Sequence, residues 1–310
     1  MEGVVVDGAT SMLGLALINE CIARGIKVLA IARKSSKRLE RIPQAESVKV
    51  VLCDQEDFTD LDTSGMGQHE VYYHFAWGNV LAKERIDVKL QEPNIGYTID
   101  AVSLALKLGC RRFIGAGSQA EYGRVSGVID SQTPVNPEVA YGIAKYAAGK
   151  MAMALCESIG MDCIWTRTFS VYGPGDNDTT LIMYTIGKLL KGEKPIFTKA
   201  EQKWDYLYSK DAGAAFRLIG EKGKNKKVYC IGSGCARPLD EYIHIIHDLI
   251  NPDLPLGIGE LEYAPLQVMN LQADISGLKE DTGFKPEYSF ERGIRETIEW
   301  YKHWKLEEEK

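Results

Sequence analysis

The order of hydrophobic and polar positions in the first half of the chain predicts short strands that alternate with helices. Apolar runs of strand length occur at Gly3–Val6, Lys27–Ala32, Val48–Leu52, Val71–Ala76, Arg112–Ala116 and Asp162–Thr166. Longer stretches with apolar residues at helical spacing lie between them, at Met12–Arg24, Asn94–Leu108 and Glu138–Ser158. Continuously apolar strands separated by helices are typical of a parallel sheet covered on both faces. We therefore predict an α/β fold with a Rossmann-like, doubly wound parallel sheet.

The pattern changes after Gly173, and the second half predicts a smaller C-terminal lobe that binds substrate. Helices are expected at Thr179–Lys191, Asp211–Gly220, Leu239–Ile250 and Glu291–Trp304, with extended segments at Trp204–Tyr208 and Val228–Ile231. We find no internal repeat and no low-complexity linker, so the lobe is expected to be woven into the first part. We predict a nucleotide-binding domain from residues 1–175 and 200–250, and a substrate-binding lobe from residues 176–199 and 251–310.

Composition excludes several classes of partner. The hydrophobic content of 45% and the charged content of 26% are those of a globular protein with a sizeable core. The net charge of −6 disfavours nucleic acid and anionic membranes as partners, since both attract basic surfaces. No apolar run reaches the roughly 18 residues of a membrane helix. The seven scattered cysteines form no Cys-x-x-Cys pair, which favours the reducing cytoplasm and predicts no metal site.

A glycine-containing turn, Gly8 to Gly14, lies between the first predicted strand and the first helix. The backbone amides and the dipole at a helix start can bind a pyrophosphate, although Ser11 occupies the usual place of a middle glycine. A purely structural turn is the alternative, but the strand–turn–helix context favours a dinucleotide site. The predicted cofactor contacts in and beside this turn are Gly8, Thr10, Ser11, Met12, Leu13 and, at the end of the fourth strand, Ala76.

The end of the second strand indicates which dinucleotide is bound. NAD sites usually place an acidic residue there, whereas this chain has Arg33 followed by Lys34. A guanidinium suits the 2′-phosphate of NADP(H), so we predict NADP(H) in preference to NAD(H); a solvated basic loop is the alternative. After the third strand, Asp54 and Gln55 are predicted cofactor contacts; Asp54 is placed to accept from the adenine amine, although it can equally cap a helix.

The spacing Tyr-x-x-x-Lys places both side chains on one face of a helix. A nearby ammonium lowers the pKa of a phenol, so that the phenol can exchange a proton with an alcohol oxygen while hydride moves at the carbon. The chain contains this spacing five times, starting at tyrosines 141, 146, 184, 206 and 301. Position favours Tyr141 with Lys145, because they open a long helix and follow the fifth predicted strand, just after which Ser118 can donate to the same substrate oxygen. Tyr146 lies roughly 140° further around the same helix.

Several segments together resemble the extended short-chain dehydrogenases, the superfamily of NAD(P)-dependent nucleotide-sugar epimerases and dehydratases. They are the Gly8–Gly14 turn, Ser118–Gly123, Tyr141 with Lys145, Arg167–Pro174 and Trp204–Tyr208, and they span nearly the whole chain in the expected order. The resemblance implies that Tyr141 is the acid/base, that Lys145 tunes it and binds the nicotinamide ribose, and that Ser118 holds the reacting oxygen. It also implies a homodimer that pairs the helix containing Tyr146–Leu155.

Two departures from the family pattern bear on the reaction. Dehydratases of this family carry an Asp-Glu pair directly after the position of Ser118, whereas this chain has Gln119 and Ala120, so dehydration is not predicted. Many members grip a substrate diphosphate with an arginine where this chain has Trp204. Lys203 and Arg237 are the nearest substitutes and, with Trp204, are the predicted substrate contacts; an ordinary surface role is the alternative.

Three functions are compatible with these residues. The leading hypothesis is an NADPH-dependent ketoreductase that acts on a 4-keto nucleotide sugar or a similar polar carbonyl compound. The second is a nucleotide-sugar epimerase, which would use the same residues without net consumption of cofactor. The third, from another class, is a sensor or scaffold that binds NADP(H) without catalysis, and the complete Ser118–Tyr141–Lys145 set argues against it.

Overall fold

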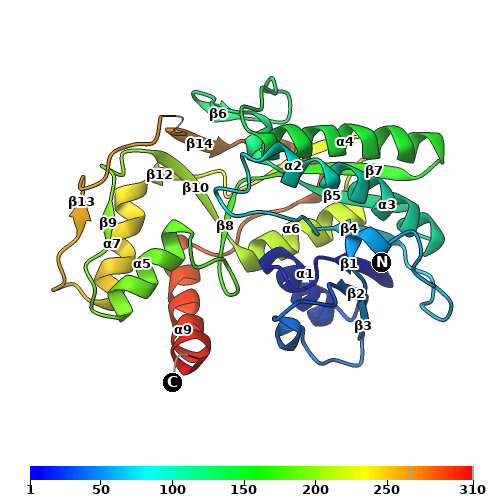
Figure 1. The fold of residues 1–310 in the computed structure, drawn as a ribbon, viewed down its shortest axis with the longest axis horizontal. Helices are drawn as coiled ribbons and strands as arrows, with labels where there is room; N and C mark the ends of the chain where they lie inside the picture. Colours follow the sequence, from blue (N-terminus) through cyan, green and yellow to red (C-terminus); the bar gives the residue numbers. More distant parts are fainter. Residues whose placement is uncertain (266, 309–310) are drawn as a thin grey trace.

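The computed structural model describes residues 1–265 and 267–308 and contains a seven-stranded parallel sheet (Figure 1). The strands, in spatial order, are β3 (Val48–Leu52), β2 (Lys27–Ala32), β1 (Gly3–Asp7), β4 (Val71–His74), β5 (Arg112–Ser118), β7 (Asp162–Thr168) and β11 (Val228–Ile231). Each neighbouring pair is parallel. The order reverses between β1 and β4, which is where doubly wound sheets bind ligands. The predicted fold class is confirmed.

Helices cover both faces of this sheet. One face is packed by α1 (Met12–Ala23) and α6 (Ser209–Lys222), the other by α3 (Pro93–Lys107) and α4 (Ala140–Ser158), with the short α2 (Val88–Gln91) beside them (Figure 1). Short 3₁₀ turns occur at η1 (Leu39–Arg41), η2 (Gln55–Asp57) and η3 (Gln119–Glu121). In the part of the chain that the structure describes, no helix is long and apolar enough to cross a membrane.

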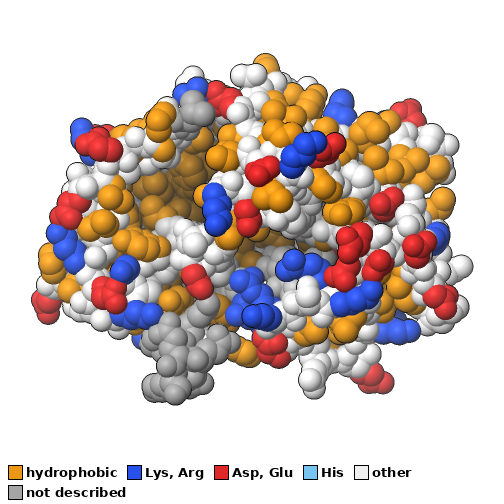
Figure 2. All heavy atoms as spheres, in the orientation of Figure 1, with side chains coloured by type: hydrophobic (Ala, Val, Ile, Leu, Met, Phe, Trp, Pro, Cys, Tyr) orange, Lys and Arg blue, Asp and Glu red, His pale blue; other side chains and the backbone are white. Residues whose placement is uncertain are grey.

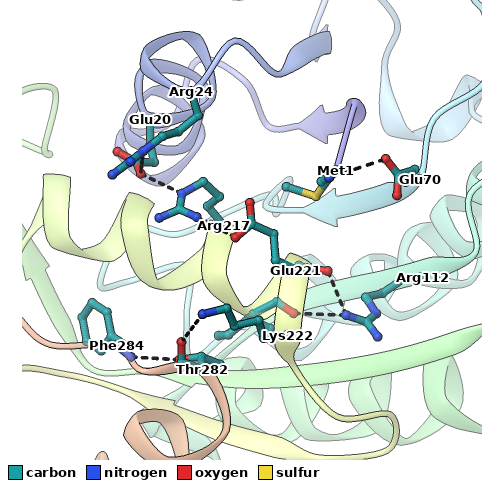
Figure 3. Close-up of polar contacts among 12 residues, drawn as sticks. Met1, Glu20, Arg24, Glu70, Arg112, Arg217, Glu221, Lys222, Thr282 and Phe284 are labelled. Carbon is teal, nitrogen blue, oxygen red and sulfur yellow. Dashed lines mark hydrogen bonds and ion pairs between the residues drawn. The ribbon is translucent and has the colours of Figure 1, made fainter.

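The contact between α1 and α6 fixes the helix that follows the glycine turn. A Cβ atom on Gly213 of α6 would lie 2.5 Å from the carbonyl oxygen of Ala16, so the two helices approach closely only with glycine there. At one edge of the contact, Arg217 donates to Glu20 of α1 at 2.7 Å and to Glu221 at 2.6 Å (Figure 3). These contacts fix α1 against α6 on this face of the sheet.

The lobe has its own helices, strands and core. Its helices α5 (Leu181–Leu190), α7 (Leu239–Ile250) and α9 (Phe290–Glu308) pack together, and α8 (Ser276–Thr282) lies against α6. A second sheet contains β6 (Val128–Ile129), β8 (Ser170–Tyr172), β10 (Lys203–Tyr208), β12 (Ala236–Pro238) and β14 (Asn270–Ala273), and a separate pair joins β9 (Ile196–Phe197) to β13 (Gly257–Ile258). Helix α7, expected with the nucleotide-binding domain, packs in the lobe core with α5 and α9. The domain boundaries themselves remain a proposal.

The sequence pattern predicted the long elements better than the short ones. Strands β2, β3 and β11 and helix α7 have the predicted bounds, whereas the six short strands of the lobe and α8 were not predicted. Most of these missed segments have only two or three residues, which is too short to show a hydrophobic period. Strand β3 also differs from the expectation of a sheet covered throughout, because it is the edge strand and leaves Val50 45% exposed.

Candidate active site

The turn after β1 has the geometry of a phosphate-binding turn. Gly8 adopts a left-handed backbone with φ of +59°, and a Cβ atom there would lie 2.6 Å from the backbone nitrogen of Ala76. A Cβ atom on Gly14 would lie 2.5 Å from the carbonyl oxygen of Gly8. Ser11 caps α1, since its hydroxyl accepts from the Gly14 nitrogen at 3.0 Å. The turn therefore requires both glycines and presents the start of α1 at the point where the strand order reverses.

A buried carboxylate holds this point together. Asp7 is fully buried, and its Oδ1 accepts hydrogen bonds from the backbone nitrogens of Phe75 at 2.7 Å and Ala76 at 2.8 Å. Its Oδ2 accepts from the hydroxyl of Tyr72 at 3.0 Å and from Nδ1 of His74 at 2.6 Å. The ends of β1 and β4 are thereby fixed side by side. Sequence reasoning did not single out Asp7, because its partners are far along the chain.

Of the two basic residues that follow β2, Arg33 and Lys34, one is free to bind a phosphate. Among the described residues, the exposed Arg33 side chain makes no ion pair or hydrogen bond, whereas Lys34 forms an ion pair with Asp57 at 2.6 Å. The hydroxyl of Ser36 donates to Oγ1 of Thr10 at 3.2 Å, which joins this segment to the glycine turn. Arg33 is therefore the predicted residue that remains able to bind a phosphate beside the turn.

The residues after β3 lie beside the same segment. Asp54 accepts from the backbone nitrogen of Lys34 at 3.3 Å, and its side chain does not cap η2, so the capping alternative is not realised. Nε2 of Gln55 is buried and, within the described ranges, has no hydrogen-bond partner. A buried amide nitrogen without a hydrogen-bond acceptor in the protein costs free energy unless a ligand supplies the acceptor. Gln55 therefore fits the predicted contact with a dinucleotide.

A cavity of about 930 Å³ lies between the large sheet and the lobe. Figure 2 shows a hollow with hydrophobic walls on the lobe side, near α5, α7 and β10 of Figure 1. The lining includes, among the predicted residues, Ser11, Met12, Leu13, Ser118, Tyr141, Lys145 and Trp204. The phosphate-binding turn and the predicted triad thus share one cavity.

The predicted substrate contacts separate into two groups. Trp204 lines the cavity, and its indole nitrogen donates to the hydroxyl of Ser170 at 2.7 Å. Lys203 and Arg237 are not among the described lining residues. Lys203 is exposed, and Arg237 forms an ion pair with Glu291 at 2.7 Å. The structure therefore gives neither cation a place in the cavity wall.

The three residues of the predicted triad come from β5 and the start of α4. The Ser118 hydroxyl, at the end of β5, accepts from the backbone nitrogen of Ala120 at 3.1 Å. Tyr141 is the second residue of α4, and Lys145 is buried one turn further on. Nζ of Lys145 donates to the carbonyl oxygen of Ala116 at 2.6 Å. These positions put a hydroxyl, a phenol and an amine around one end of the cavity.

The charges around the triad differ from the expected arrangement. Burial raises the pKa of Tyr141 above its ordinary value, while the positive charge of Arg85 and a hydrogen bond from Ser118 oppose this rise. Burial also lowers the pKa of Lys145 to about 7, against the opposing effect of Glu121. We expected Lys145 to acidify Tyr141, yet the cation that lies over the Tyr141 ring is Arg85, with its Cζ 4.7 Å from the ring centroid. Sequence reasoning did not identify Arg85.

A buried ion pair supports the loop after Ser118. Oε1 of Glu121 accepts from the Ser118 nitrogen at 2.9 Å and from the Trp165 indole at 3.0 Å, and its Oε2 accepts from Nε of Arg167 at 2.9 Å. The Ser-x-x-Glu spacing of a capping box was present in the sequence and would have indicated this role. With Gln119 before it, this loop offers no uncommitted carboxylate for an elimination step.

The sheet, the phosphate-binding turn and the Ser–Tyr–Lys set define an enzyme of the extended short-chain dehydrogenase type. The chain belongs to the NAD dependent epimerase/dehydratase family, whose model matches residues 4–232. The resemblance inferred from the sequence is therefore confirmed.

Individual relatives and solved structures are similar to this chain over nearly its whole length. A dTDP-glucose 4,6-dehydratase of Xanthomonas campestris pv. campestris is 26% identical, over 96% of this chain and 92% of the relative. The structure of a UDP-N-acetylglucosamine 4-epimerase from Methanobrevibacter ruminantium M1 has a TM-score of 0.86 at 24% identity and covers 97% and 98% of the two chains. A dTDP-glucose 4,6-dehydratase from Bacillus anthracis, in complex with NAD, has a TM-score of 0.84 at 19% identity and covers 99% and 98%.

Proposed function

We propose that this enzyme binds a nicotinamide dinucleotide along the Gly8–Gly14 turn and interconverts a hydroxyl and a keto group of a nucleotide sugar. The observation that supports the proposal most directly is that Tyr141 and Ser118 share one cavity with the phosphate-binding turn. The fit of a dinucleotide is also supported by the unpartnered buried amide of Gln55. When bound, the nicotinamide accepts and returns the hydride.

The side chains of the triad then divide the proton chemistry. Tyr141 takes the proton from the substrate hydroxyl during oxidation and returns it during reduction. Ser118 donates a hydrogen bond to the same substrate oxygen, and so stabilises the negative charge that develops on it. Lys145 is held by the Ala116 carbonyl at 2.6 Å, close to the cavity wall, where its ammonium can donate to a ribose hydroxyl.

Epimerisation is the first candidate reaction. The family to which the chain belongs and the epimerase among its structural neighbours support this reading, which the sequence analysis placed second. The loop Ser118–Glu121 disfavours dehydration, because Gln119 and Ala120 carry no acid and Glu121 is committed to Arg167. Ketoreduction is the second candidate, and the unpaired Arg33 favours it, because the NADP(H) pool of cells is kept reduced.

The two candidates differ in whether reduced cofactor is consumed. We expect purified enzyme with UDP-glucose or UDP-N-acetylglucosamine to form the C4 epimer without a lasting change in reduced-nicotinamide absorbance. Sustained loss of that absorbance with a 4-keto nucleotide sugar and NADPH would identify a ketoreductase instead. If neither assay gives product and titration with each dinucleotide shows no binding, the proposed function is wrong.

The preference for NADP(H) is a separate proposal and rests on Arg33. Replacing Arg33 with Ser should weaken NADPH binding about tenfold, since one charge-assisted contact contributes about 1.4 kcal/mol, and should leave NADH binding nearly unchanged. Calorimetric titration with both dinucleotides measures this. Lys27→Ser, an exposed residue at the other end of β2, is the matched control. Equal losses for NADPH and NADH, or no loss for either, would contradict the proposal.

The homodimer also remains a proposal. The helix expected to pair, α4, carries exposed apolar side chains, with Ile143 53% and Met151 51% accessible, and Leu106 of the neighbouring α3 is 51% accessible. A second copy that covers them would remove this apolar area from water.

A further inference from the structure

The loop from Trp77 to Asp87, between β4 and α2, places two side chains against the triad that the chemistry above does not use. The Arg85 guanidinium lies 4.7 Å from the ring centroid of Tyr141. The Trp77 ring centroid lies 6.1 Å from that of Tyr141, with the ring planes at 82°. Both loop residues line the cavity together with Tyr141 and Lys145. The loop therefore forms one wall of the reacting end of the site.

Arg85 is held in its position by its own backbone and side chain. Its carbonyl oxygen accepts from the backbone nitrogen of Tyr141 at 2.9 Å, which ties the loop to the start of α4. Its Nε donates to the carbonyl oxygen of Val80 at 2.8 Å. The neighbouring Glu84 carboxylate accepts from the Leu81 nitrogen at 2.9 Å, and no carboxylate among the described residues forms an ion pair with Arg85. No described carboxylate therefore offsets the positive charge of the guanidinium beside the phenol ring.

Lys145 interacts with a different ring. Its Nζ lies 3.7 Å from the centroid of Trp77, and the Trp77 indole nitrogen donates to Oε1 of Gln91 at 2.9 Å, which fixes the indole. The ring face and the Ala116 carbonyl both stabilise the ammonium form of Lys145. The indole therefore contacts both the amine and the phenol, and the amine is directed to the Trp77 face.

We propose that Arg85 is a positioning residue that stabilises the phenolate of Tyr141, a role that the Tyr-x-x-x-Lys pattern assigns to Lys145. This inference rests on the proposed function, because it takes Tyr141 as the acid/base. The groups that act on the Tyr141 hydroxyl are Arg85 from the loop, Ser118 from β5 and the Glu121 carboxylate from η3, with Lys145 further along α4. Of these, Arg85 is positively charged, whereas burial lowers the pKa of Lys145 to about 7 and so removes its charge in the alkaline range where a tyrosine ionises.

Removing the Arg85 charge should make Tyr141 harder to ionise. Arg85→Gln is expected to raise the pKa of Tyr141 by about one unit, which is the lower end of the effect of one nearby opposite charge, because Arg85 is exposed to solvent. At a pH below the pKa of Tyr141, the fraction of Tyr141 in the phenolate form is then about tenfold smaller in Arg85→Gln than in the unaltered chain. In turnover, the acid limb of the pH profile for alcohol oxidation shifts to higher pH by the same amount, since the base must be ionised to accept the proton.

The test measures Tyr141 ionisation directly and needs no substrate. The ultraviolet absorbance of tyrosinate is titrated for the full chain and for Arg85→Gln, each with and without Tyr141→Phe, so that the difference isolates Tyr141. Circular dichroism sets the pH range in which all variants stay folded. We expect about tenfold less Tyr141 phenolate in Arg85→Gln at a given alkaline pH, and a near-normal fraction in Arg85→Lys.

Controls separate the charge of Arg85 from general effects on the loop. Lys83→Gln removes an exposed charge from the same loop and should leave Tyr141 ionisation unchanged. Equal ionisation in Arg85→Gln and the unaltered chain would overturn the proposal, as would an equally large loss of Tyr141 phenolate in Lys83→Gln. Because the titration does not depend on turnover, either result leaves the proposed reaction to be judged by its own assay.

Discussion

Replacing Tyr141 with Phe is expected to lower the rate of hydride transfer by about 10²–10⁴-fold, the usual contribution of one acid/base group. The substitution removes only the phenolic hydroxyl. The ring keeps its edge contact with Trp77 and its place under the Arg85 guanidinium, so the fold and the cavity walls should not change. Turnover is measured with a sugar substrate and dinucleotide, and calorimetric titration should give nearly unchanged dinucleotide binding.

Tyr146→Phe is the matched control for this prediction. Tyr146 lies on the same helix and begins another Tyr-x-x-x-Lys spacing, but it does not line the cavity among the described residues. Its loss should leave turnover unchanged. If Tyr141→Phe turns over as fast as the unaltered chain, Tyr141 is not the acid/base and the triad assignment fails.

Glu121→Gln is expected to destabilise the fold by about 3–5 kcal/mol, the usual cost of breaking a buried ion pair by removing one partner. Glu121 is fully buried and the Arg167 side chain is only 7% exposed, so the substitution leaves an uncompensated charge inside the protein. The amide group of Gln would also place a donor opposite the Arg167 donor. Urea unfolding measures the change in the free energy of unfolding.

Glu138→Gln provides the comparison for the buried pair. Glu138 forms an ion pair with Arg124 at 2.8 Å, but both side chains are partly exposed, at 29% and 46%. Solvent screens such a pair, and its loss should cost less than about 1 kcal/mol. Equal losses in the two variants would show that the Glu121–Arg167 pair contributes no more than a surface pair does.

The candidate site was predictable wherever a short segment determines its own geometry. The glycines of the Gly8–Gly14 turn are required by contacts within and just beside that turn. Tyr141 and Lys145 were proposed because their spacing matches one turn of a helix, and their place at the start of the helix that follows the fifth strand distinguished them from the four other pairs. Their electrostatic partners were not predictable, since Arg85 reaches Tyr141 from a loop more than fifty residues away along the chain.

The sequence also could not show which of the predicted substrate contacts face the cavity. Lys203 and Trp204 are neighbours in β10, and successive side chains of a strand point to opposite faces. Only Trp204 lines the cavity, whereas Lys203 is exposed. Arg237 is adjacent to Trp204 across the strands but forms an ion pair with Glu291 of α9. A list of nearby cations was therefore not enough to identify which of them face the cavity.

Local sequence pattern was enough to predict the parallel sheet, its covering helices, the phosphate-binding turn and the place of Tyr141 at the start of a long helix, because hydrophobic period and glycine placement act over a few residues. Only the tertiary structure decided that Arg85 lies over Tyr141, that Lys145 faces Trp77, that Glu121 is committed to Arg167 and that α7 packs in the lobe. These features depend on which distant segments the fold brings together, and charge and burial at a site are set by those neighbours rather than by the local pattern.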